Sequence, residues 1–292
     1  MSERKVSLVL PAQDFEEGGG FLVHRPFPVP GVMQVDPFLL IDELGPVQYA
    51  PGEAIGAPDH PHRGFETVTY VIEGENQHAD SAGHRGQIGP GDVQWMTAGA
   101  GVVHAEMPSE RMMREGGRQH GFQIWINLPR ADKFVRPRYQ DVRSSQIPVW
   151  RSEDGRASAR VIAGEAQGVA GAAQTRIPIG FVHYRLEPGA RIEHAVLDGH
   201  TAIVYLMSGE ARFGGERKHA ARAAIVFDRT GDTIPVENAG TEPLEFLMLT
   251  GEPIEEPMVR YGPFVMNTPD ELEQAFADFQ AGKMGAIEPI YS

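Results

Sequence analysis

The chain has 292 residues and contains no cysteine. This absence excludes disulfide bonds, thiolate metal ligands and a cysteine nucleophile. Because disulfides rarely persist in reducing compartments, a chain without cysteine fits such a compartment, and we expect a cytoplasmic location.

Long apolar runs and an excess of positive charge are also lacking. Residues 6–10 form a short apolar stretch before Pro11, too short for the core of a signal peptide, and no other run approaches the roughly 18 residues of a membrane helix. The formal net charge of −14 disfavours direct nucleic-acid binding, which requires a basic surface. Arg111, Arg114 and Arg118 form a local basic cluster, which we interpret as a solvated loop. We therefore expect neither a nucleic-acid nor a membrane partner.

Glycine and proline, in contrast, are abundant, with 34 and 23 residues spread along the chain. This composition is typical of many short strands joined by tight turns. The length favours two domains, and the segment TAIVYLMSGEARF in the second half corresponds to ETVTYVIEGENQH in the first. We predict one domain over residues 1–137 and another over 138–292, with the polar residues 130–145 as the crossover.

Local patterns predict individual elements. Segments rich in β-branched and aromatic residues beside turn signals are the predicted strands: residues 65–72, 121–129, 181–186, 201–209, 223–227 and 244–249.

The chain ends with a predicted helix. Thr268 is a suitable N-cap, Pro269 fits the first helical position, and Glu271 completes a capping box. An apolar face follows at helical spacing, formed by Leu272, Ala275, Phe276 and Phe279, and Gly282 ends the helix. We interpret this face as a packing surface and the helix as a lid on one end of a barrel.

Two short motifs carry the chemistry of the chain, His60-Pro61-His62 and His104-Ala105-Glu106. In a β-strand, residues i and i+2 point to the same face. Two such strands side by side would bring three imidazoles and a carboxylate together, which is a ligand set for a divalent transition metal. A single HxH motif is weak evidence, but two matched motifs in strand-like runs favour a metal site.

The residues around these motifs resemble the two motifs of the cupin superfamily. The first is HPHRGFETVTYVIEG at residues 60–74, and the second is GPGDVQWMTAGAGVVHAE at residues 89–106. The chain departs from the cupin pattern in four ways: Gly74 lies one residue late, Thr97 replaces a proline, two extra residues precede His104, and Pro108 replaces an asparagine.

Four separated segments, in the same order, resemble the pirin family within that superfamily. They are DPFLLIDE at 36–43, the 60–74 segment, VVHAEMP at 102–108 and NTPDELEQAFADFQAGKMG at 267–285. The resemblance extends from about residue 20 to the end of the chain. It implies an all-β fold of two tandem cupin-type (jelly-roll) β-barrels with a short C-terminal helix, and one metal in the N-terminal domain.

The residues alone leave the carboxylate ligand open, because strand parity places Glu66 on the same face as His62, four residues earlier. Most cupins take this ligand from the first motif, whereas pirins take it from the second, two residues after the histidine. The resemblance therefore implies His60, His62, His104 and Glu106 as metal ligands, with Glu66 as a nearby pocket residue.

The resemblance also implies quercetin 2,3-dioxygenase activity, in which a flavonol such as quercetin binds through its 3-hydroxyl group. Molecular oxygen then opens the central ring with release of carbon monoxide, and Glu106 takes the hydroxyl proton. Fe(II) is the expected metal, with Mn, Ni, Co, Cu and Zn as alternatives. Asp42, Phe65, Gln123 and Trp125 are of the types that line a partly apolar pocket for a small aromatic substrate.

Two other hypotheses remain. Pirins include metal-dependent regulatory proteins, so this chain could bind a protein partner, as a transcriptional coregulator or a modulator of a metabolic enzyme. A third hypothesis is a cupin of unrelated chemistry, because one fold hosts many functions. Oxygen uptake and carbon monoxide release with quercetin would distinguish them.

The second half lacks the metal motif. Glu193-His194-Ala195 occupies the HxH position, and the segment FDRTGDTIPVENAG, where the second motif is expected, contains no histidine. We expect no metal site there, and we interpret His194 and His200 as surface or hydrogen-bonding residues.

Overall fold

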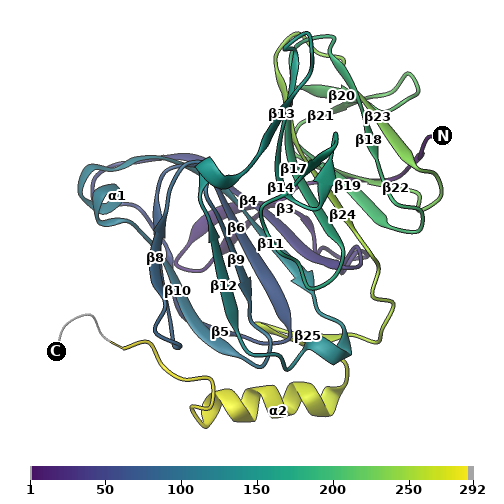
Figure 1. Cartoon of the computed structure of the whole chain (residues 1–292). Helices are drawn as coiled ribbons and strands as arrows, with labels where there is room; N and C mark the ends of the chain where they lie inside the picture. The colour runs from purple at the N-terminus through teal and green to yellow at the C-terminus, as the bar shows by residue number, and fades with distance from the viewer. Residues whose placement is uncertain (1, 289–292) are drawn as a thin grey trace. The chain divides into compact units, whose positions relative to one another are not determined.

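The computed structural model describes residues 2–288 and folds most of them into β-strands (Figure 1). The described chain forms two compact units. Unit 1 contains residues 2–13, 25–37 and 145–253, and unit 2 contains residues 14–24, 38–144 and 254–288.

This division differs from the predicted boundary after residue 137. Strand β1 (Val6–Pro11) pairs with β22 (Ala223–Phe227) in unit 1, although it lies at the N-terminus. The C-terminal helix belongs to unit 2, although it follows the second barrel in sequence. A strand pairs with an available sheet edge, and a helix packs on an apolar face that it can cover. For this reason both elements belong to the unit formed mainly by the other half of the sequence.

Unit 2 has two main sheets that together form a β-barrel. The larger sheet contains, in spatial order, β12 (Arg138–Val142), β9 (Val93–Thr97), β6 (Phe65–Glu73), β11 (Gly117–Asn127), β4 (Phe38–Tyr49), β3 (Phe21–Phe27) and β2 (Gln13–Glu17). The smaller sheet contains β5 (Ala57–His62), β10 (Val102–Pro108), β7 (Asn76–Asp80) and β8 (Arg85–Ile88). A hairpin of β25 (Val259–Tyr261) and β26 (Phe264–Met266) completes the unit.

Unit 1 repeats this two-sheet plan. Its larger sheet contains β1, β22, β19 (Thr201–Ser208), β24 (Leu244–Gly251), β17 (Ile179–Leu186), β14 (Ala157–Ala163) and β13 (Val149–Arg151). Its smaller sheet contains β18 (Arg191–Ala195), β23 (Thr233–Asn238), β20 (Glu210–Arg212) and β21 (Lys218–Ala220), and a small hairpin pairs β15 (Glu165–Ala166) with β16 (Val169–Ala170). The six predicted strands correspond to β6, β11, β17, β19, β22 and β24.

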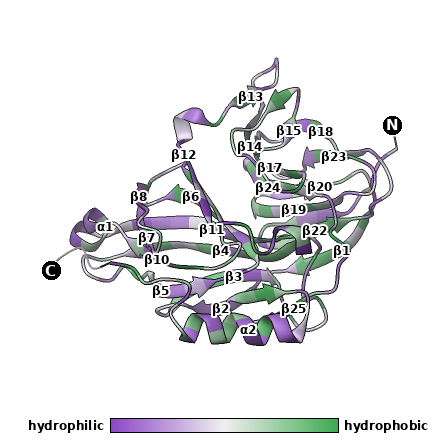
Figure 2. Cartoon of the chain, turned by 60° about the horizontal axis from the view of Figure 1, so that its bottom comes forward, coloured by the Kyte–Doolittle hydropathy of each residue, from purple (hydrophilic) through white to green (hydrophobic). Residues whose placement is uncertain are grey.

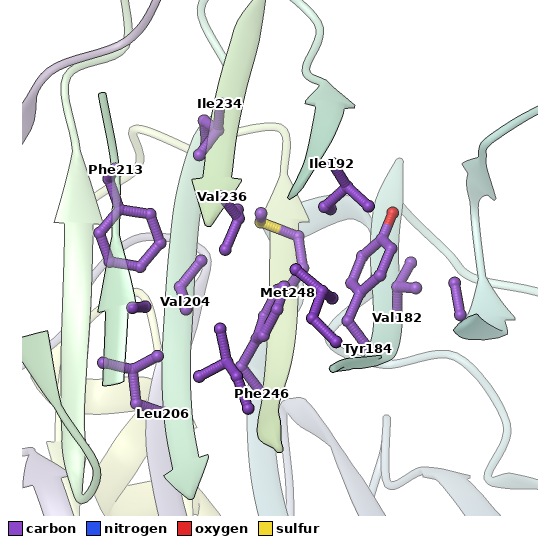
Figure 3. Close-up of a cluster of buried hydrophobic side chains, with 14 of the residues drawn as sticks. Val182, Tyr184, Ile192, Val204, Leu206, Phe213, Ile234, Val236, Phe246 and Met248 are labelled. Carbon is purple, nitrogen blue, oxygen red and sulfur yellow. The ribbon is translucent and has the colours of Figure 1, made fainter. Parts of the chain in front are cut away.

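Apolar side chains from both sheets fill the interior of unit 1 (Figure 3). Tyr184 on β17, Val204 on β19 and Phe246 on β24 pack with Ile192 and Val236 of the smaller sheet. Because these side chains occupy the space between the sheets, the interior of this barrel has an apolar core.

The C-terminal helix α2 spans Pro269–Gln280 and confirms the predicted start. The side chain of Thr268 accepts a hydrogen bond from the backbone of Glu271, and the Glu271 side chain accepts one from the backbone of Thr268. Figure 2 shows hydrophilic and hydrophobic residues alternating along α2. Ala275 on its inner side packs against Phe264 of β26.

The basic segment after β10 is not the loop that we predicted. It contains helix α1 (Glu110–Glu115), with Ser109 as N-cap, and Arg111 forms an ion pair with Glu75 at 2.8 Å. Two short 3₁₀ turns, η1 (Arg130–Asp132) and η2 (Ser144–Gln146), flank β12 in the segment predicted as a crossover. Among the described residues, neither helix has the length and apolar character needed to cross a membrane.

Candidate metal centre

Strands β5 and β10 are antiparallel neighbours, and they bring the two histidine motifs together. His104 lies opposite His60, and His62 lies opposite Val102. The ring centroids are 4.7 Å apart for His60 and His62, 4.3 Å for His60 and His104, and 4.9 Å for His62 and His104. One ring nitrogen of each histidine lies within 4.8 Å of the other two, so the predicted convergence of three imidazoles is confirmed.

The protonation of these histidines fits a metal site. His62 and His104 are 3% and 1% exposed, and burial, followed by the charge of neighbouring histidines, holds the pKa of each well below its usual value. Both imidazoles are therefore neutral at physiological pH, as metal ligation requires. In the described structure, Nδ1 of His62 and both ring nitrogens of His104 have no hydrogen-bond partner.

A backbone carbonyl orients the ring of His60. Its Nδ1 lies 2.7 Å from the carbonyl oxygen of Pro58, so Nδ1 carries the proton and donates it. Nε2 of His60 is then the ring nitrogen that is free to face a metal, which is the arrangement found in metal-ligating histidines.

Glu106 lies two residues after His104 on β10 and therefore on the same face. The Thr69 hydroxyl on β6 donates to Oε1 of Glu106 at 2.5 Å and lies 2.7 Å from the side-chain oxygen Oε1 of Gln123 on β11. A hydroxyl group has one proton, so Thr69 donates to one of these two oxygens at a time, and both contacts become hydrogen bonds only when the Gln123 amide is turned so that its nitrogen donates to Thr69. This chain of contacts orients one oxygen of the Glu106 carboxylate.

Glu66 lies on the other face of β6, and the argument from strand parity was wrong. Strand β5 ends at His62, and Gly64, with φ +88°, interrupts the alternation before β6 begins. Thr69 contacts Glu106, so the alternation within β6 places Glu66 on the opposite face. There Glu66 is fully buried and accepts a 2.5 Å hydrogen bond from Thr97.

Aromatic side chains border the histidines. The ring of His62 contacts Phe65 and Trp125 edge-on, each with centroids 5.1 Å apart, and these two rings lie 4.5 Å from each other. The guanidinium of Arg260 on β25 stacks over Trp125 at 4.7 Å. This side of the site is therefore apolar and aromatic, with one cation above it. The predicted pocket residues Phe65 and Trp125 lie here.

A row of polar side chains crosses the larger sheet at the level of Thr69. Cross-strand pairing places Asp42 opposite Gln123, Gln123 opposite Thr69, Thr69 opposite Gln94, and Gln94 opposite Asp141. Since directly paired residues share a face, these five side chains line one level of the barrel interior.

His78, on β7 of the smaller sheet, contacts one residue of this row. It pairs with Glu106 across the strands β7 and β10, and its Nε2 lies 3.4 Å from the Asp141 carboxylate. We predicted Asp42 and Gln123 as pocket residues but missed Thr69, Gln94, His78 and Asp141. The available signal was the presence of single polar residues in strands that otherwise read as buried, such as Thr69 in β6 and Gln94 in β9.

The fold and this site define a class of protein: a chain of two cupin barrels with a histidine-rich metal-site candidate in one of them. Residues 20–126 match the family model described as Pirin, and residues 181–285 match the model of the Pirin C-terminal cupin domain. The chain belongs to the pirin family.

Known relatives extend over nearly the whole chain. A pirin-like protein of Solanum lycopersicum is 42% identical, covering 92% of this chain and 89% of its own length. Pirin of Homo sapiens is 40% identical, covering 97% of this chain and 95% of its own. The crystal structure of a quercetin 2,3-dioxygenase from Acinetobacter baumannii is 36% identical, with a TM-score of 0.92, 98% of this chain covered and 100% of that chain.

Proposed function

We propose that this protein is a metal-dependent oxidoreductase of the quercetin 2,3-dioxygenase type. It would open the central ring of a flavonol with O2 and release carbon monoxide. The observation that carries the proposal is the cluster of three converging imidazoles, of which His62 contacts two aromatic rings. The structural similarity to a protein named as quercetin 2,3-dioxygenase supports it.

We assign the metal to His60, His62, His104 and Glu106. The three histidines offer imidazole nitrogens, and Glu106 offers a carboxylate that would also offset part of the metal charge. Because Oε1 of Glu106 accepts the hydrogen bond from Thr69, we assign Oε2 to the ligand role. When bound, the metal would supply Lewis acidity and a path for electrons to O2. Fe(II) is our assignment, and the same donor set also suits Mn, Ni, Co, Cu and Zn.

Glu106 is also the proposed base. A flavonol must lose the proton of its 3-hydroxyl group before its central ring is electron-rich enough to react with O2. A carboxylate beside the metal can accept that proton at its oxygen and hold it through turnover. Thr69 would keep the carboxylate oriented for this transfer, because its hydroxyl fixes Oε1.

The aromatic side of the site suits the substrate. Phe65 and Trp125 offer ring faces and edges against which a planar aromatic compound can pack. Arg260 above Trp125 would attract the negative charge of a deprotonated flavonol.

The test is oxygen uptake and carbon monoxide release after quercetin is added to the iron-loaded protein. We expect both for the wild type, loss of bound metal in His104→Ala, and loss of turnover with an altered affinity or spectrum of the bound metal in Glu106→Gln. Glu66→Gln is the matched control, since Glu66 is a buried glutamate on the other face of β6, and it should keep both metal and turnover. Wild-type protein that binds iron but releases no carbon monoxide from quercetin or related flavonols would refute the proposal.

That negative result would favour the second hypothesis, a metal-dependent regulatory protein. The regulatory hypothesis predicts that loading or oxidising the metal changes the affinity for a protein partner without turnover. The two functions therefore differ in what the metal alters: a substrate in one case, a binding surface in the other.

A further inference from the structure

The residue after the metal-ligand candidate His62 is joined to the C-terminal helix by an ion pair. Arg63 is only 6% exposed, and its Nη1 lies 2.9 Å from Oδ2 of Asp278 on α2. Its Nε donates to the carbonyl of Ala100 at 2.7 Å. The hydrogen bonds from Lys283 and Arg63 hold the pKa of Asp278 below its usual value, so the carboxylate is ionised. Losing Asp278 would leave a largely buried guanidinium without its counter-charge.

The backbone beside His62 is fixed by the β25–β26 hairpin. The amide of Arg63 donates to the carbonyl of Pro263 at 3.3 Å, and the amide of Val265 donates to the carbonyl of Arg63 at 3.1 Å. The next residue, Gly64, has φ +88°, and a Cβ there would lie 2.0 Å from the carbonyl oxygen of Val265. Only glycine allows the backbone at residue 64 to approach the hairpin this closely.

A buried lysine reinforces the same junction. Lys133 is fully buried, and its Nζ donates to the carbonyls of Gly64 and Val265 at 2.8 and 3.0 Å and to the side chain of Asn127 at 2.8 Å. These three bonds use all the protons of one ammonium group. They join Gly64, two residues after His62, to Val265 of β26.

Strand β10, which carries His104, also contacts the C-terminal segment. Val103, one residue before His104, packs with Phe264, Ala275 and Met284. The amide of Val103 donates to the hydroxyl of Ser81 at 3.1 Å, and that hydroxyl donates to the carbonyl of Met284 at 2.7 Å. Both strands that carry histidines are therefore held by the same C-terminal segment.

We propose that residues 254–285 form a C-terminal clamp that holds the histidines in metal-binding geometry, with Asp278 of the clamp and its ion-pair partner Arg63 as positioning residues. The clamp couples metal affinity to the docking of α2. By linkage, if docking of the helix favours the metal, the metal must favour docking of the helix by the same factor. This proposal rests on the metal site assigned above and is independent of the flavonol reaction.

The test compares Asp278→Asn with Asp270→Asn, the same substitution at an exposed position of the same helix. Metal affinity is measured by chelator competition with Fe(II), and with Ni(II) as an oxygen-stable probe. We expect the dissociation constant of Asp278→Asn to rise roughly tenfold, within the usual range of coupling between sites, and that of Asp270→Asn to stay within about twofold.

A second measurement needs no variant. Amide hydrogen exchange in α2 of the wild type should slow when metal is added, whereas exchange in β18 and β23 of unit 1 should not change. Unchanged exchange in α2, or equal metal affinity in Asp278→Asn and the wild type, would overturn the clamp. A wild type that binds no metal would overturn the clamp and the metal site together, whereas absence of turnover with intact metal binding would overturn only the proposed reaction.

Discussion

Thr69 is a residue whose function depends on a single atom. Its hydroxyl touches the Glu106 carboxylate and the Gln123 amide, so it fixes the group that we propose as ligand and base. A side chain of the same shape without the hydroxyl would lose both contacts.

Thr69→Val keeps the shape of the side chain and removes the hydroxyl. We expect kcat with quercetin to fall about tenfold, because the carboxylate of Glu106 loses its orientation in a buried site, while KM changes little. Thr69→Ser should restore most of the activity, since it keeps the hydroxyl. The measurement is steady-state kinetics with metal content determined for each variant, and a wild-type kcat in Thr69→Val would contradict the role.

Lys133 donates hydrogen bonds to three buried acceptors from one buried ammonium group. Its ammonium is completely buried, and burial lowers its pKa to about 8. Its removal has two opposing effects. Three buried acceptors lose their donor, at about 1–3 kcal/mol each, whereas the desolvation cost of several kcal/mol for the ammonium disappears.

We expect Lys133→Met to lower the free energy of unfolding by roughly 2–4 kcal/mol, because the lost hydrogen bonds outweigh the relieved desolvation. Lys218→Met, at a lysine with an exposed side chain, should change it by less than about 0.5 kcal/mol. Urea denaturation monitored by circular dichroism measures both. A Lys133→Met protein as stable as the wild type would mean that the three acceptors find other partners.

At the level of secondary structure, the metal-site candidate depends on the pairing of β5 with β10. Each strand alone presents only two ligand candidates on one face, and the antiparallel register of His60 with His104 brings the two sets together. The larger sheet contributes through β6 and β11, which place Thr69 and Gln123 beside Glu106. The end of β5 at His62 matters as well, because the turn at Gly64 redirects the chain and turns Glu66 to the other face.

Across the whole molecule, two barrels of similar plan have different interiors. Unit 2 holds histidines, carboxylates and amides between its sheets, whereas unit 1 holds an apolar core (Figure 3). His194 occupies the position in unit 1 that corresponds to the HxH motif. It is 3% exposed, and its Nδ1 lies 2.9 Å from the hydroxyl of Tyr184. It is therefore a hydrogen-bonding residue, one of the two roles that we expected, and it is not on the surface.

This buried histidine predicts a pH dependence of stability. Burial lowers the pKa of His194 to about 4, whereas an unfolded histidine has a pKa near 6.5. Between these values the unfolded chain binds a proton that the folded chain does not, so the free energy of unfolding falls as the pH decreases from about 6.5 to 4. The loss is at most about 3 kcal/mol and levels off below pH 4.

His194→Gln removes this titration and keeps a polar side chain for Tyr184. We expect its stability to fall less steeply than that of the wild type over the same pH range, as measured by urea denaturation at several pH values. Other groups titrate equally in both proteins, so the difference isolates His194. Parallel pH profiles would show that His194 does not contribute.

The sequence by itself determined the local features and the family. The capping box of α2 follows from Thr268 and Glu271, because a helix start depends on residues within one turn. The HxH spacing on β5 predicts a shared face, because the alternation of a strand is local. Four motifs in order identified the pirin family and with it the two barrels.

Only the tertiary structure decided which distant segments complete each unit and which polar groups meet. The pairing of β1 with β22 and the packing of α2 on β26 depend on sheet edges and apolar faces far away in sequence. The contact of Thr69 with Glu106 joins opposite sheets. The parity argument for Glu66 failed because one glycine with positive φ ended the alternation on which it relied, and no spacing in the sequence records where a strand ends.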